Sequence, residues 1–206
     1  MFNSIVAHLT DMIPSLAHAL APVFGDHFDD DHAVSTLTED APDAALAEDQ
    51  DRRQVFIGHW EASGIKVVEG KELPYVGYMY NSWDLDKSWL VLDFKETNPP
   101  VGKAFKEDQY WGFTKETGVH TRPMMTSIPG FALVTSMGWV GDASSWTGTY
   151  DVGGTRLDLT ETITLFGRNK FRMYGEMFIK GKSVGLYDIT CTRKRQGNHH
   201  DATPTV

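Results

Sequence analysis

The sequence predicts a mainly β protein: a single antiparallel barrel that follows a short helical, acidic N-terminal extension. From Gln54 onward, Trp, Tyr, Phe, Val and Thr occur in short runs broken by Gly, Pro, Asn and Asp, a pattern typical of strands. Gly-containing connections at 151–154, 167–169 and 180–182 are typical of hairpins. Because a long antiparallel meander exposes unpaired edges unless it closes, a barrel is the simplest arrangement.

The strands follow from alternation and from the turn residues between them. We expect strands at 54–61, 64–69, 72–81, 88–95, 108–114, 119–126, 131–140, 145–152, 155–165, 170–179 and 183–194. Ahead of them, apolar side chains at helical spacing predict one or two short helices within residues 2–24.

Charge divides the chain into an acidic leader and a neutral body. Residues 1–53 hold 11 acidic side chains and two arginines, whereas residues 54–206 hold 17 acidic and 17 basic side chains. Residues 26–53 are acidic and poor in large apolar groups, so we interpret them as a linker or a loosely packed arm. The predicted division is an extension at 1–53, a barrel at 54–195 and a disordered tail at 196–206.

Composition also excludes several classes of protein. A neutral body without a Lys/Arg stripe argues against nucleic-acid binding. No apolar run is long enough to span a membrane, and the first basic residue, Arg52, comes too late for a secretory signal. Because Cys191 is the only cysteine, no internal disulfide forms, and we expect a cytoplasmic protein.

Two residues at opposite ends of the body resemble a known barrel pattern. Gly58-His59-Trp60 lies on the first strand of the body, and Arg193 lies near the end of the last. The pairing resembles the calycin and lipocalin pattern, in which such a tryptophan packs under an arginine of the last strand at the closed end of the barrel. An indole face and a guanidinium plane also attract each other physically.

Further stretches resemble the calycin-like barrel family catalogued as domain of unknown function 1579. These are Ser82-Trp-Asp-Leu-Asp-Lys-Ser-Trp89, the run from Trp146 through Glu161, Gly181-Lys182 and Thr192-Arg-Lys194. The resemblance covers about residues 54–195, and it implies a calycin-like barrel with a cavity. His120-Thr-Arg-Pro-Met-Met125 has no counterpart in that family.

Aromatic side chains are the first candidates for ligand contacts. An interior rich in Trp and Tyr suits a flat, mainly apolar ligand, although such residues also serve simply as core. The candidate ligand-binding residues are His59, Tyr78, Tyr80, Trp89, Tyr110, Trp111, Trp139 and Trp146.

Glu161 lies on the apolar face of its strand, in phase with Leu159 and Ile163. A buried carboxylate needs a partner, for which Arg122, Arg172 and a Tyr hydroxyl are the candidates. Four interpretations stay open: a structural ion pair, a ligand-orienting acceptor, a general base with a raised pKa, or a bulge that turns Glu161 outward.

His120 and Arg122 are two residues apart, so they share one strand face. A base beside a cation suits an anionic or phenolate oxygen, but two polar residues facing water are equally consistent. The motifs His27-Phe-Asp-Asp-Asp-His32 and His199-His200 invite a metal interpretation, but they lack a Cys or a third ordered His, so we expect no metal. Nucleotide-binding and hydrolase motifs are absent from the sequence, so we expect no cofactor.

These observations lead to three hypotheses about function. The first is a barrel that binds a small hydrophobic or aromatic molecule in its interior. The alternative is a cofactor-independent lyase, isomerase or cyclase, with Glu161 or His120 as base and Arg122 or Arg172 holding an oxyanion. The third is an interaction module that forms a homodimer through the N-terminal helix.

Overall fold

The computed structural model describes residues 41–100 and 102–194. Within these residues, one helix, α2 (Ala41–Gln54), precedes eleven strands. They are β1 (Gly58–Val68), β2 (Lys71–Asp84), β3 (Trp89–Glu96), β4 (Lys106–Thr114), β5 (Val119–Thr126), β6 (Gly130–Ser136), β7 (Trp139–Val140), β8 (Ala143–Val152), β9 (Thr155–Leu165), β10 (Lys170–Ile179) and β11 (Lys182–Arg193).

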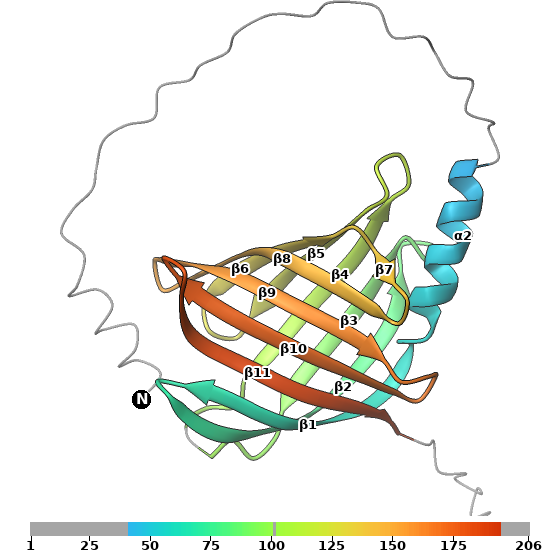
Figure 1. Ribbon diagram of the computed structural model, residues 1–206. Helices are drawn as coiled ribbons and strands as arrows, with labels where there is room; N and C mark the ends of the chain where they lie inside the picture. Colours follow the sequence, from blue (N-terminus) through green and yellow to red (C-terminus); the bar gives the residue numbers. More distant parts are fainter. Residues whose placement is uncertain (1–40, 101, 195–206) are drawn as a thin grey trace, which may run out of the picture.

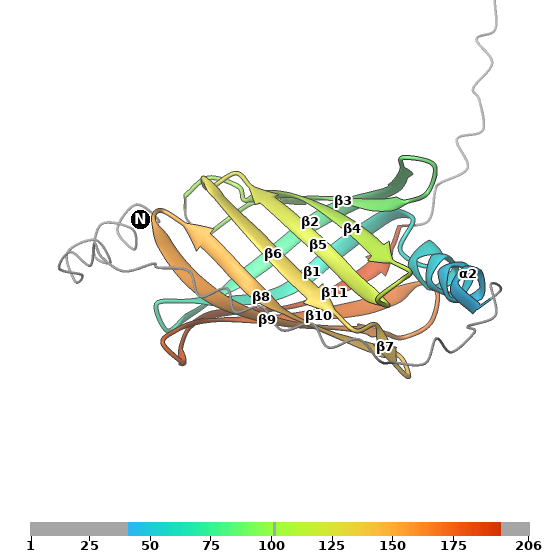
Figure 2. The same cartoon turned by 90° about the horizontal axis from the view of Figure 1, so that it is seen from above.

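The strands form one closed antiparallel barrel, as the sequence predicts. Neighbouring strands pair in the order β6-β5-β4-β3-β2-β1-β11-β10-β9-β8, and a β6–β8 pairing closes the ring at ten strands. The two-residue strand β7 pairs only with β8, beside this ring. α2 lies at one end of the barrel (Figures 1 and 2).

Two of the predicted strand boundaries are wrong. The segments expected at 54–61 and 64–69 are one strand, β1, which continues through Gly64. A side chain at 64 would overlap the backbone carbonyl of Asp188, so glycine here permits close pairing with β11. The strand expected at 131–140 is interrupted at Gly138, whose φ of 97° is readily available only to glycine.

The interpretation of residues 41–53 as part of a linker or loosely packed arm is also wrong. Two charged residues of α2, Asp49 and Arg53, are 6% and 1% exposed, and they pair with each other at 2.5 Å. Arg53 donates to the carbonyl oxygens of Trp111 at 2.9 Å and Ser88 at 3.2 Å. Polar contacts rather than an apolar stripe therefore dock α2 on the barrel, which composition alone does not reveal.

Arg193 stacks on Trp60, as the calycin pattern implies. The guanidinium carbon lies 4.2 Å from the centre of the Trp60 ring, and Trp60 itself is 1% exposed. The same guanidinium donates to the carbonyls of Val55 and Ile57, in the turn that joins α2 to β1. This contact ties the first and last strands together beneath the helix.

Several predictions concern residues outside the described part of the chain. They are the helices within residues 2–24, the histidine motifs at 27–32 and 199–200, and the tail at 196–206. Among the described residues, the single helix is too short and too polar to cross a bilayer.

Candidate functional site

The end of the barrel beside α2 is closed by aromatic side chains. The rings of Trp111 and Phe171 lie 5.2 and 4.9 Å from that of Phe56, and the ring of Trp60 lies 4.8 Å from that of Phe171. All four residues are at most 1% exposed. No ligand can enter here without displacing this layer.

The opposite end of the barrel is more open. Here the inward-facing positions of the strands carry residues that remain partly exposed, namely Leu73, Glu107, Thr126, Tyr150 and Met177. We call this end the mouth. The sealed end has no such partly exposed layer, so a ligand of the interior would have to enter from the mouth.

A buried ion pair lies between the mouth and the aromatic layer. Glu161 of β9 is 2% exposed and contacts the Nη2 atom of Arg122, a fully buried residue of β5. The Tyr187 hydroxyl of β11 donates to the other oxygen of Glu161. The predicted inward direction of Glu161 is thus confirmed, and so is Arg122 as its partner.

Gly175 makes room for the third member of this cluster. It pairs with Tyr187 on one side and with Glu161 on the other, so the Tyr187 side chain must cross over it. A Cβ atom at position 175 would overlap the Tyr187 ring. The absence of a side chain at 175 therefore allows the Tyr187 phenol to reach the Glu161 carboxylate. Burial beside Glu161 holds the Tyr187 pKa well above its ordinary value, so the hydroxyl keeps its proton and acts as a donor.

Arg122 has more donors than this cluster uses. Its Nε and Nη1 atoms are buried and have no hydrogen-bond partner among the described residues. Its guanidinium carbon lies 4.5 Å from the centre of the Trp146 ring, and the Trp146 Nε1 atom is likewise buried and unpartnered. Because unpaired buried donors are costly, this concentration of them marks a place where a ligand atom can bind.

Glu107 is the second ionisable group of the interior site, and sequence reasoning missed it. It lies on the inner face of β4, in phase with buried Gln109 and Trp111. Burial raises its pKa from 4.5 to about 7; the Arg122 charge lowers that pKa, whereas the Glu161 charge adds to the rise. Near neutral pH, Glu107 can therefore either donate or accept a proton.

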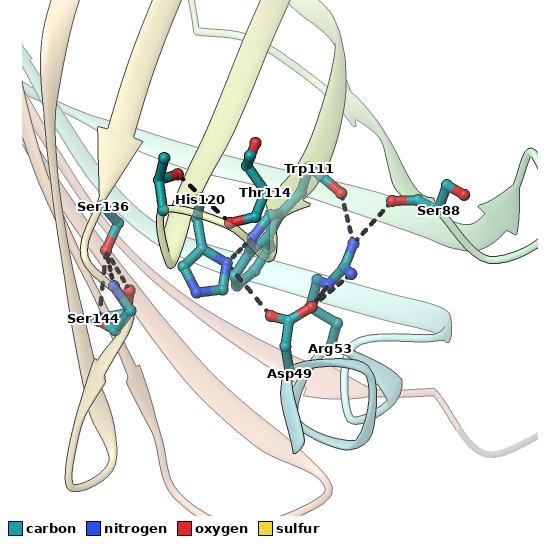
Figure 3. Close-up of polar contacts among 10 residues, drawn as sticks. Asp49, Arg53, Ser88, Trp111, Thr114, His120, Ser136 and Ser144 are labelled. Atoms are coloured by element: carbon teal, nitrogen blue, oxygen red, sulfur yellow. Dashed lines mark hydrogen bonds and ion pairs between the residues drawn. The ribbon is translucent and has the colours of Figure 1, made fainter. Parts of the chain in front are cut away.

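His120 belongs to a different cluster, under α2 (Figure 3). Its Nδ1 atom accepts a hydrogen bond from Trp111 Nε1 at 3.0 Å and lies 3.3 Å from an Asp49 oxygen. Burial, and then the charge of Arg53, lowers the His120 pKa to about 4. His120 does share an inward face with Arg122, but it is neutral near pH 7 and helps to seal the barrel.

Arg172 lies on the outside of the barrel, so its predicted place beside Glu161 is wrong. It alternates with the buried residues Phe171 and Met173, and it forms two hydrogen bonds of 2.6 Å with Asp188 on the outer face. An inward Arg172 would need a register shift of β10 by one residue, which would expose Phe171 and Met173.

Most of the aromatic candidates also face outward. Trp111 and Trp146 are fully buried inside the barrel, and Trp139 packs against Phe56 in the aromatic layer. The prediction that the other candidates line the interior is wrong, because each lies on the outer face of its strand, next to a buried residue that points inward. These outward-facing candidates are His59, Tyr78, Tyr80, Trp89 and Tyr110.

A surface pocket lies apart from these residues. It has a volume of about 260 Å³ and lies against α2, where it is lined by Glu48, Asp51, Arg52, Val55, Asp142, Leu165, Gly167 and Arg168. It contains none of the predicted site residues. Its charged groups are mixed in sign and lie at the surface, so the buried unpartnered donors of the interior are the stronger site.

Comparisons with known proteins give likenesses of shape alone. No family model and no curated protein matches the sequence. The S-type phycobiliprotein lyase CPES from Guillardia theta is 9% identical, with a TM-score of 0.45 over 74% of this chain and 94% of that chain. A protein of unknown function of the DUF3598 family, from Nostoc punctiforme, is also 9% identical, with a TM-score of 0.21 over 70% of this chain and 98% of that chain. These values are too low to carry an inference about function.

Proposed function

We propose that this protein binds a small, mainly apolar molecule, hydrophobic or aromatic, inside the barrel. The observation that carries the proposal is Arg122, fully buried, with two donor atoms that have no partner among the described residues. A core side chain whose only role was to pair with Glu161 would leave fewer donors unsatisfied. A bound molecule that accepts from these atoms explains their arrangement.

The surroundings of Arg122 support an apolar body for the ligand. The inward residues of β9 that flank Glu161 are Leu157, Leu159 and Ile163, and Met173 faces them from β10. Trp146 adds a flat aromatic surface directly beside the guanidinium. Such a wall, with a few polar atoms that fix orientation, is the usual composition of a small-molecule site.

Two matched substitutions test the location of the site with 1-aminoanthracene, an uncharged fluorescent aromatic probe. Leu157 faces inward and is 7% exposed, whereas Leu133 faces outward and is 41% exposed. We expect wild-type protein and Leu133→Trp to bind the probe equally. Leu157→Trp should weaken binding by about tenfold or more, because its larger side chain takes up part of the interior space.

Fluorescence titration of the three proteins measures this difference, with circular dichroism as the check of folding. Equal binding by both variants would place the probe outside the barrel. Failure of the wild-type protein to bind the probe up to its solubility limit would remove the support for an interior apolar site.

The enzyme hypothesis is a second candidate, and Glu107 is the observation that favours it. A carboxyl with a pKa of about 7, close enough to Arg122 for the charge to act on it, is suited to acid/base catalysis without a cofactor. Glu161 is less suited to be the base, because Arg122 and Tyr187 already occupy its oxygens. Exchange of the acetyl C–H protons of bound 2-acetylnaphthalene for deuterium in D₂O, faster than in buffer alone and lost in Glu107→Gln, would support an enzyme; exchange no faster than in buffer would favour a binder.

Membership of the domain of unknown function 1579 family is part of the same proposal, on the residues given above. So are the cytoplasmic location and the homodimer formed through the N-terminal helix. We also propose that the barrel is a separate domain that begins near Gln54, although Arg53 contributes hydrogen bonds to its closed end.

A further inference from the structure

We propose that the ligand presents an uncharged carbonyl oxygen to Arg122, as a ketone, aldehyde or ester does, and not a carboxylate. This inference rests on the proposed function and names the chemical class of its ligand. It follows from the unpaired donors around Arg122 and from the charges that are already balanced in the interior.

The unpartnered polar atoms beside Arg122 are mainly donors. They are the Nε and Nη1 atoms of Arg122 and the Nε1 atom of Trp146, whose ring lies against the guanidinium. The Gln109 Oε1 atom is an unpartnered acceptor on the neighbouring strand β4. A carbonyl oxygen accepts two N–H hydrogen bonds and brings no donor of its own, so it fits the donors of this set and leaves the Gln109 acceptor to another group.

The charge of Arg122 is already balanced by Glu161. Lys66, which is also inside the barrel, is balanced by Glu96 at 2.6 Å, and Glu96 accepts a further bond from the Phe105 amide. A carboxylate entering this space would therefore meet no uncompensated cation among the described interior residues, and Glu161 would repel it. An uncharged oxygen avoids that repulsion and still gains a hydrogen bond from a charged donor.

Glu107 adds a donor when it is protonated. The ionisable groups that act on it or respond to its charge come from the surrounding strands: Tyr75 of β2, Arg122 of β5, Tyr150 of β8, Glu161 of β9, Tyr187 of β11 and, on its own strand, Asp108. Only Arg122 in this set is a cation. Loss of the Glu107 proton removes a donor and adds a negative charge that competes for Arg122.

Three probes of similar shape test the ligand class by calorimetric titration of the full chain at pH 6.0: 2-acetylnaphthalene, 2-isopropylnaphthalene and 2-naphthoate. We expect the ketone to bind about tenfold or more tightly than the hydrocarbon, the effect of one hydrogen bond to a charged donor. The carboxylate should bind more weakly than the ketone.

The outcomes separate this inference from the proposed function. If the ketone and the hydrocarbon bind equally, or if the carboxylate binds most tightly, the carbonyl inference fails and the interior site stands. If none of the three binds, the proposed function fails with it.

A double substitution tests whether Arg122 is the residue that recognises the carbonyl oxygen of the ligand. Arg122→Met/Glu161→Leu replaces the buried pair by apolar groups of similar size, a change that proteins often tolerate. We expect this variant to bind the ketone and the hydrocarbon with equal affinity. A ketone preference that persists would assign the recognition to other residues.

The pH dependence supplies an independent test. Ketone affinity should fall as the pH rises from 6 to 8, because Glu107, whose pKa is about 7, loses its proton over this range. In Glu107→Gln, which keeps a donor and cannot ionise, the affinity should stay constant over this range. A flat profile in the wild-type protein, or a slope that survives in Glu107→Gln, would overturn the role of Glu107.

Discussion

Trp60→Ala should lower the free energy of unfolding by about 3 to 5 kcal/mol, the usual cost of truncating a large core aromatic. Trp60 is 1% exposed, packs edge-on against Phe171, and carries Arg193 on its ring. Its Nε1 atom also donates to the Phe56 carbonyl at 2.7 Å. The truncation therefore opens a cavity at the sealed end and removes the surface on which Arg193 stacks.

Denaturant unfolding of the purified variant measures this loss, and Trp89→Ala is the matched control. Trp89 is half-buried on the outer face, over Gly112, so its truncation should cost less, below about 2 kcal/mol. A Trp60→Ala loss of under about 1 kcal/mol would mean that the sealed end does not depend on this residue.

Glu161→Ala should destabilise the protein by a similar amount, about 3 to 5 kcal/mol, because it leaves the Arg122 charge buried without its anion. Both members of the pair have fully buried side chains. The double variant Arg122→Met/Glu161→Leu removes the charge as well, so its stability should lie within about 1 to 2 kcal/mol of the wild-type value.

The comparison of the two variants separates charge from packing. Urea unfolding at pH 7 gives both values. If the double variant is as unstable as Glu161→Ala, the loss comes from altered packing and not from an unpaired cation. If Glu161→Ala costs less than about 1 kcal/mol, Arg122 is not confined to the interior.

The alternation of apolar and polar residues along the strands explains why the fold could be predicted well from the sequence. The strands expected at 119–126, 155–165 and 170–179 have the bounds of β5, β9 and β10. In β9 the apolar and polar faces contrast strongly, so the inward direction of Glu161 could be predicted correctly. The same rule applied to β10, with Phe171 and Met173 inside, would have placed Arg172 outside.

In other strands, the inward and outward faces carry residues of similar polarity. In β2, the outward residues Tyr78 and Tyr80 are as aromatic as inward Tyr75, so composition does not distinguish the faces. In β4, the run Lys106-Glu-Asp-Gln109 is polar on both faces, and nothing but its phase with Trp111 indicates that Glu107 points inward. The candidate site was therefore incomplete where alternation gave no signal.

Other contacts between distant elements could not be predicted from the sequence. The burial of Asp49 and Arg53 depends on carbonyl groups of β4 and of the β2–β3 turn, which lie 35 or more residues away in sequence. Likewise, Tyr187 reaches Glu161 only because Gly175 lies between them. Each contact depends on strand register, which local sequence does not specify.

The most direct test of an interior ligand site is a crystal structure of the protein with 6-bromo-2-acetylnaphthalene, located by the anomalous signal of its bromine. We expect the bromine inside the barrel, on the mouth side of Trp111, and the ketone oxygen within hydrogen-bond distance of Arg122 Nε or Nη1. Bromine only on the outer face, or only in the surface pocket against α2, would contradict an interior site.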